Sequence, residues 1–176
     1  MLIEFYLLFT VIGGLFSEIS KSEQVKKTYL KLVFIIAFII AGFRGENVGC
    51  DTLSYHFIYE RIRELGITEL PRNTELEKGF MILCWILGKI SSSPQILFVV
   101  SSGVISYSFY KIINDYSKDY MLSSVIFVST IFTITMNVMR QYLALTLLFL
   151  SIKYTIDKKK NASIIFLLLA ISMHYS

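Results

Sequence analysis

Residues 121–152 read MLSSVIFVSTIFTITMNVMRQYLALTLLFLSI, an apolar stretch of 32 residues in which Arg140 is the one charged side chain. A single straight helix of that length would extend about 48 Å, well beyond the roughly 30 Å hydrocarbon core of a membrane. The stretch therefore predicts two membrane-spanning helices, 121–136 and 142–156, that meet at a turn near Arg140.

The composition of the whole chain is also typical of a membrane protein. Of its 176 residues, 55% are hydrophobic and 17% are charged, and the mean hydropathy is +0.62. The apolar residues form blocks separated by charged connectors, which excludes a disordered chain and an ordinary cytosolic enzyme. The two cysteines, Cys50 and Cys84, form no CxxC pair, so neither a zinc site nor a disulfide framework is expected.

Further apolar blocks predict the other helices of an all-α, polytopic transmembrane bundle with about five or six spans in a single domain, 1–176. The block 79–90 has only 12 residues, so we interpret it as a re-entrant segment or a short span. The other predicted spans are 2–16, 30–43, 95–113 and an incomplete one at 162–176.

The distribution of lysines predicts the orientation of the bundle. Lysines gather in the connectors 17–31, 111–120 and 153–161, and cytoplasmic loops are enriched in Lys and Arg. The polar stretch 44–78 lies one span after the first of these connectors, so we expect it to form an external loop. If 79–113 crosses the membrane twice, the connector 111–120 lies outside instead, and the sequence leaves both arrangements open.

Arg140 is the first candidate for chemistry, because a charge among apolar residues is costly near lipid. Its guanidinium either extends to the membrane surface and anchors a turn or clamps an anion, since its planar fork matches phosphate oxygens.

A second candidate region opens the predicted external loop. Glycines at 42, 45 and 49 allow tight turns and a close approach of a ligand to the backbone. Arg44 directly follows a span, and Asp51 begins a pattern typical of a helix N-terminus. A capped interfacial helix explains Asp51 and the aromatic residues after it, but it does not explain a charged, glycine-spaced loop at the membrane surface.

Two more residues could handle protons. Glu77 precedes an apolar block and either stabilises the dipole of a helix or serves as a general base or an acceptor for a sugar hydroxyl. His174 lies near the end of an apolar block and is structural or a proton-transfer group, and His56 is a weaker candidate. The sequence contains no metal cage, phosphate-binding loop or nucleic-acid motif, so we expect no metal, no cofactor and no nucleic-acid partner.

Four short motifs that occur in order along the chain resemble the EpsG/Wzy-type family of bacterial exopolysaccharide and capsular polysaccharide polymerases. The motifs are Phe43-Arg44-Gly45 with Val48-Gly49-Cys50-Asp51-Thr52 and Tyr55, then Glu77-Lys78-Gly79-Phe80, then Asn137-Val138-Met139-Arg140-Gln141 with Ala144, and finally His174-Tyr175-Ser176. Where Asn137-Val138-Met139 stands here, members of the family often have a glycine. Members are also about twice as long, so the resemblance implies that the chain is an N-terminal portion, and it leaves open whether that portion is active by itself.

The resemblance implies a glycosyltransferase-type polymerase in the bacterial cytoplasmic membrane. Such a protein joins oligosaccharide repeat units carried on undecaprenyl pyrophosphate, at the outer face of that membrane. Under this hypothesis Arg44 and Arg140, both at the outer surface, stabilise the leaving pyrophosphate. Glu77, Asp51 or His174 then accepts or orients the proton of the acceptor hydroxyl.

The same hypothesis predicts the remaining site residues and the partners. Tyr55, Gln141 and Asn137 are expected to bind substrate. The expected partners are the lipid-linked oligosaccharide, membrane lipid, and the chain-length regulator and flippase of the same pathway. Two alternatives remain open: a transporter or flippase for lipid-linked oligosaccharide, for which no repeated halves are visible, and a non-catalytic subunit of a polysaccharide assembly complex.

Overall fold

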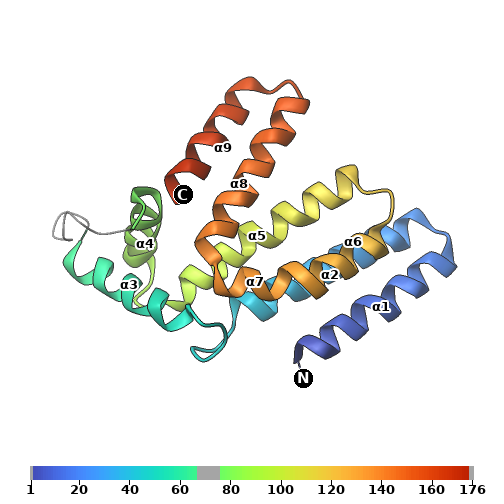
Figure 1. The fold of residues 1–176 in the computed structure, drawn as a ribbon, viewed down its shortest axis with the longest axis horizontal. Helices are drawn as coiled ribbons and strands as arrows, with labels where there is room; N and C mark the ends of the chain where they lie inside the picture. Colours follow the sequence, from blue (N-terminus) through green and yellow to red (C-terminus); the bar gives the residue numbers. More distant parts are fainter. Residues whose placement is uncertain (1, 67–75, 175–176) are drawn as a thin grey trace.

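The computed structural model describes residues 2–66 and 76–174, and every regular element in these two ranges is helical, which confirms the predicted all-α class. Figure 1 shows the helices in an elongated bundle. In chain order they are α1 (Leu2–Ser20), α2 (Glu23–Gly42), α3 (Thr52–Leu65), α4 (Lys78–Ile90), α5 (Gln95–Tyr116), α6 (Tyr120–Ile126), the π-helical turn η1 (Phe127–Ile131), α7 (Phe132–Asn137), α8 (Met139–Ile156) and α9 (Lys160–Met173).

Several of these helices suit a membrane. Among the described residues, three helical runs are long and apolar enough to cross one: α1, α5 and the continuous run Tyr120–Asn137. The helix α2 has 20 residues but begins with charged side chains, and α8 has 18 residues and carries Arg140 and Lys153. The structure therefore agrees with a membrane-embedded bundle, and the number of crossings stays a prediction.

The helices α2 and α5 pack along each other and form the centre of the bundle. Leu30, Val33 and Ala37 of α2 are fully buried, as are Leu97 and Phe98 of α5. The helix α1 and the run α6–α7 lie on one side of this pair, whereas the hairpin of α8 and α9 packs against α5 and α4 (Figure 1). Large apolar side chains remain exposed along α1 and α9, as expected for surfaces that face lipid.

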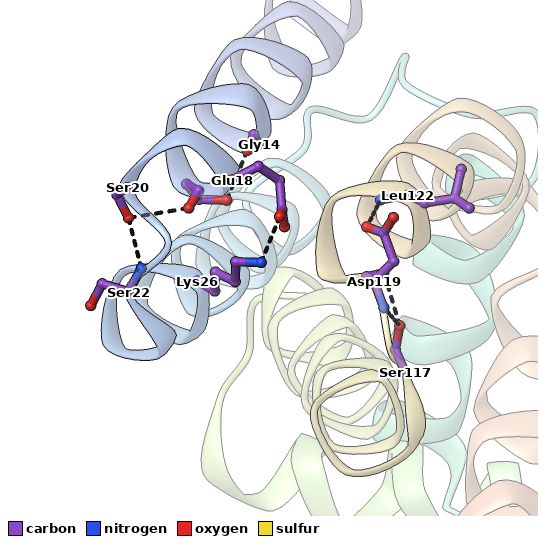
Figure 2. Close-up of polar contacts among 9 residues, drawn as sticks. Gly14, Glu18, Ser20, Ser22, Lys26, Ser117, Asp119 and Leu122 are labelled. Carbon is purple, nitrogen blue, oxygen red and sulfur yellow. Dashed lines mark hydrogen bonds and ion pairs between the residues drawn. The ribbon is translucent and has the colours of Figure 1, made fainter.

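The three lysine-rich turns lie at the same end of the bundle. In Figure 1 the α1–α2, α5–α6 and α8–α9 turns are all toward the right and upper side of the view. Lys153 near the end of α8 pairs with Asp115 near the end of α5 at 2.9 Å. Figure 2 shows the first two turns next to each other, with Lys26 paired to Glu18 across one of them and Asp119 in the other. Lys26 also interacts electrostatically with Asp119.

At the opposite end, the predicted external loop contains the amphipathic helix α3. Asp51 occupies the N-cap position of α3, as the sequence predicts, but its side chain makes no capping hydrogen bond. Its backbone has φ −97° and ψ −1°, which is helical, whereas a capping residue normally adopts an extended conformation. The N-terminus of α3 is instead held by Thr52, which donates to the carbonyl of Val48.

The turn predicted near Arg140 is a break at a single residue. Helix α7 ends at Asn137 and α8 begins at Met139, with Val138 at φ −105° and ψ 53°. The two helices diverge from this point. The run α6–α7 packs against α1 and α2, whereas α8 packs against α5 and α9. The break thus brings the start of α8 to the same end of the bundle as α3.

The short block that we predicted as 79–90 is the helix α4. Its 13 residues extend about 20 Å, which is less than the thickness of the hydrocarbon core. It packs against α3 and α9. The close approach to α9 depends on Gly79, where an added Cβ atom would overlap the backbone and side chain of Ser172.

Candidate functional site

Two side chains from distant parts of the chain, Arg140 and His174, meet at Glu77. Arg140 Nη1 donates to Glu77 Oε2 at 2.5 Å, and His174 Nδ1 lies 2.5 Å from Glu77 Oε1. The side chain of Glu77 is only 5% exposed, whereas those of Arg140 and His174 are 25% and 21% exposed. The carboxylate is therefore buried, and its two partners reach from it toward the surface.

The ends of three helices position this cluster. Glu77 is the N-cap residue of α4, Arg140 is in the first turn of α8, and His174 is the C-cap residue of α9. The side chain of Glu77 makes no capping hydrogen bond to α4. Glu77 therefore lies at the N-terminus of a helix, as the helix-dipole explanation predicts. Its two carboxylate oxygens, however, contact Arg140 and His174 and not the backbone of α4.

Aromatic side chains form the wall behind the cluster. The Arg140 guanidinium lies over the ring of the buried Phe80, 5.6 Å from its centroid, and the Tyr55 ring meets Phe80 edge-on at 5.8 Å. Burial raises the pKa of the Tyr55 hydroxyl, and the neighbouring Arg140 opposes that rise because its charge favours the phenolate. Tyr55, predicted to bind substrate, is thus a buried neighbour of Arg140.

Arg44, which directly follows α2, is buried, with only 5% of its surface exposed. Its guanidinium stacks on the ring of Phe98 at 4.4 Å, and Nη2 contacts the sulfur of Met139 at 3.9 Å. Its Nε is buried and has no hydrogen-bond partner. Burial lowers the pKa of Arg44 to about 10, which is still well above neutral pH, so the side chain stays charged. None of the carboxylates in the ranges 2–66 and 76–174 pairs with it.

The two arginines belong to one region. Met139, which contacts Arg44, directly precedes Arg140 at the start of α8. Tyr55 interacts electrostatically with both guanidinium groups. The structure thus brings together Arg44, Tyr55, Glu77, Arg140 and His174 at the end of the bundle opposite the lysine-rich turns.

The other predicted residues surround this region without joining the Glu77 cluster. Asn137 accepts a hydrogen bond from the backbone N–H of Cys50 at 2.9 Å, so its carbonyl oxygen holds the loop before α3. This contact needs Gly49, which has φ +90° and packs against Asn137. Gln141 is exposed beside Arg140, and Asp51 is half-buried and interacts electrostatically with Tyr55.

Some residues that contact the candidate site could not be identified from the sequence. Phe98 and Met139 contact Arg44, but both sit inside apolar blocks that look like ordinary core. The ring of His56, the weaker histidine candidate, packs at a tilt against Phe98, and its Nδ1 lies 3.9 Å from a carboxylate oxygen of Glu46. In the ranges that the structure describes, no three His, Cys, Asp or Glu side chains are grouped to hold a metal ion.

Comparison with known proteins places the chain in a family. No curated protein and no solved structure matches it at a significant level. The family model of the EpsG family matches residues 27–176, a range that includes every residue of the region described above. The chain therefore belongs to the EpsG family.

Proposed function

We propose that the protein is a polysaccharide polymerase that joins lipid-linked oligosaccharide repeat units at the outer face of the bacterial cytoplasmic membrane. Membership of the EpsG family supports a polymerase-type membrane protein of polysaccharide biosynthesis. The observation that carries the finer proposal is the position of Glu77, a buried carboxylate held between Arg140 and His174.

The pairing of Glu77 with His174 suggests how the acceptor hydroxyl is activated. When Nδ1 of His174 carries the proton and donates a hydrogen bond to Glu77, the lone pair of Nε2 remains free to accept another proton. The carboxylate then orients the imidazole and stabilises the imidazolium that forms. In this scheme His174 is the general base and Glu77 is its positioning residue. The sequence alone leaves Glu77, Asp51 and His174 as equal candidates for the base.

The proposed reaction exchanges one bond to the anomeric carbon for another. The hydroxyl oxygen of the acceptor repeat unit attacks the anomeric carbon of the growing chain, and its proton passes to Nε2 of His174. The bond between that carbon and the pyrophosphate oxygen breaks, and the electron pair leaves with the lipid pyrophosphate. Negative charge therefore develops on the leaving group, where a fixed cation lowers the barrier most in a water-poor site.

Arg140 and Arg44 are the proposed cations. Arg140 uses one Nη atom for Glu77, and its buried Nε has no partner, so it keeps donors for a phosphate oxygen. Arg44 has a buried Nε without a hydrogen-bond partner, and none of the described carboxylates pairs with its guanidinium. The lysine-rich turns at the other end of the bundle favour an external position for both residues, because lysine-rich loops stay in the cytoplasm.

The test is an analysis of lipid-linked sugars in cells that lack the gene and receive either wild type, Arg140→Gln or Arg61→Gln. Arg61 is an exposed residue of α3 outside the site and provides the matched control. We expect single repeat units on lipid pyrophosphate to accumulate at the outer face with Arg140→Gln, and normal polymer with Arg61→Gln. Accumulation at the inner face would instead indicate a flippase, and normal polymer with Arg140→Gln would reject the proposed function.

A further inference from the structure

A pocket lined by two lysines lies beside the first turns of α2, close to the lysine-rich α1–α2 turn. This basic pocket has a volume of about 450 Å³, and Tyr110 of α5 lines it opposite α2. The side chains that α2 contributes recur at spacings of three and four residues, so they share one face of the helix. They are Glu23, Gln24, Lys27, Thr28 and Lys31.

Lys27 and Lys31 carry charges that the fold leaves without a partner. Neither ammonium group forms an ion pair with a carboxylate in the part of the chain that the structure describes. The neighbouring Lys26 differs, because it pairs with Glu18 (Figure 2) and also interacts electrostatically with Glu23. Of the described carboxylates, Glu23 alone lines the basic pocket. Two ammonium groups and one carboxylate give the pocket a net positive charge.

An apolar groove between α1 and α2 adjoins the basic pocket. It has a volume of about 630 Å³ and shares Gln24 and Thr28 with the pocket. Large apolar side chains such as Phe9 line the rest of the groove. From Ser17 to Phe5 it follows α1 for about 18 Å, which is comparable with the roughly 15 Å of hydrocarbon in one leaflet of a membrane.

A second apolar groove adjoins the same pocket between α2 and α5. It has a volume of about 400 Å³ and shares Lys31 and Tyr110 with the pocket. The rest of its lining consists of Phe34, Ile35, Phe38, Gly103, Ser106 and Tyr107. The two grooves thus leave the basic pocket along neighbouring faces of α2, and both continue away from the lysine-rich turns.

We propose that the basic pocket and its two grooves bind one anionic phospholipid of the cytoplasmic leaflet, with the phosphate at Lys27 and Lys31 and one acyl chain in each groove. Basic pockets between membrane helices on the cytoplasmic side are suited to anionic head groups. The hydroxyls of Thr28 and Tyr110 add hydrogen-bond donors for phosphate oxygens. Two separate grooves match the two chains of a phospholipid, whereas an isoprenoid carrier has a single chain. The inference goes beyond the proposed function and does not depend on it.

The test of the head-group site is native mass spectrometry of the full chain in detergent, titrated with dioleoyl phosphatidylglycerol or dioleoyl phosphatidylcholine. We expect the wild type to bind the first phosphatidylglycerol about tenfold more tightly than phosphatidylcholine, and Lys27→Gln/Lys31→Gln to bind both equally. The matched control is Lys158→Gln/Lys160→Gln, which removes the same charge at the α8–α9 turn and should keep the preference. All four lysines are exposed, so the substitutions leave the core intact.

Gly103 tests the groove between α2 and α5. A leucine there would fill the groove, whereas an alanine adds one methyl group at ordinary contact distance from Phe38. We expect the wild type and Gly103→Ala to bind dioleoyl phosphatidylglycerol more tightly than the one-chain lysophosphatidylglycerol. Gly103→Leu should bind the two lipids equally, because the α1–α2 groove then holds the one chain that still fits.

Three results would overturn the proposal. Equal binding of the two head groups to the wild type, or an unchanged preference in Lys27→Gln/Lys31→Gln, would reject the anionic site. A two-chain preference that persists in Gly103→Leu would reject the second groove. Displacement of phosphatidylglycerol by an equal concentration of farnesyl pyrophosphate would assign the pocket to an isoprenoid carrier instead. None of these readouts involves polymer formation, so the inference fails or succeeds separately from the proposed function.

Discussion

Glu77 is the residue on which the proposed chemistry depends. Its carboxylate is buried, and it is balanced by one permanent cation and one imidazole. Removing one partner of a buried ion pair typically costs about 3–5 kcal/mol, because the remaining charge is left uncompensated, whereas replacing both partners costs much less. Loss of polymer in a single variant therefore has to be separated from loss of the folded protein.

A double-mutant cycle makes that separation. We expect Arg140→Gln and Glu77→Gln each to lower the thermal stability of the purified protein, and the double variant to recover most of the loss. The reason is that two neutral amides leave no unpaired charge. Thermal unfolding in detergent measures the stability of the wild type, of the two single variants and of the double variant. Losses that simply add in the double variant would contradict a direct pair between Arg140 and Glu77.

The approach of α4 to α9 is the feature of the helices that assembles the site. Gly79 lies two residues after Glu77, and an added Cβ atom there would collide with Ser172, two residues before His174. At Gly45 an added Cβ atom would meet nothing within 4 Å. The contact between these helices therefore fixes the distance between Glu77 and His174.

Gly79→Val tests this contact, with Gly45→Ala as its control. We expect Gly79→Val to separate α4 from α9, to reduce polymer, and to leave the protein in the membrane, because the contact lies at the ends of both helices. Gly45→Ala should behave as wild type. Polymer yield and membrane abundance are measured together, and a normal polymer yield in Gly79→Val would show that the Glu77–His174 contact is not required.

Sequence patterns predicted the helices better than they predicted their ends and partners. The apolar blocks and the break near Arg140 appear as helices and as the interruption at Val138, because burial and lipid exposure leave a local signal in the sequence. The pairing of Glu77 with residues 63 and 97 positions further on has no local signal, because it depends on how distant helix ends pack. The burial of Arg44 likewise depends on Phe98 and Met139, which belong to other helices.

At the scale of the whole molecule, charge and chemistry are segregated to opposite ends. The three lysine-rich turns share one end (Figure 1). The Glu77 cluster and Arg44 lie at other helix ends, namely after α2, at the start of α4 and α8, and at the end of α9. Because cytoplasmic loops are enriched in Lys and Arg, this separation predicts that the proposed chemistry takes place on the external side.

Cysteine labelling in intact cells checks this orientation. In a chain without Cys50 and Cys84, we expect Glu46→Cys to react with a membrane-impermeant maleimide. Lys158→Cys should react only after the membrane is permeabilised. Both residues are exposed, so access to solvent on each side decides the result. The reverse pattern would contradict an external site.

The most direct test of the proposed chemistry is the lipid-linked sugar pattern of gene-deleted cells that carry the double variant Glu77→Gln/Arg140→Gln at wild-type membrane abundance. We expect single repeat units on lipid pyrophosphate to accumulate at the outer face and polymer to be absent, because the folded protein then lacks both the cation and the carboxylate that orients His174. Polymer of normal length from that variant would contradict a role for the Glu77 cluster in the reaction.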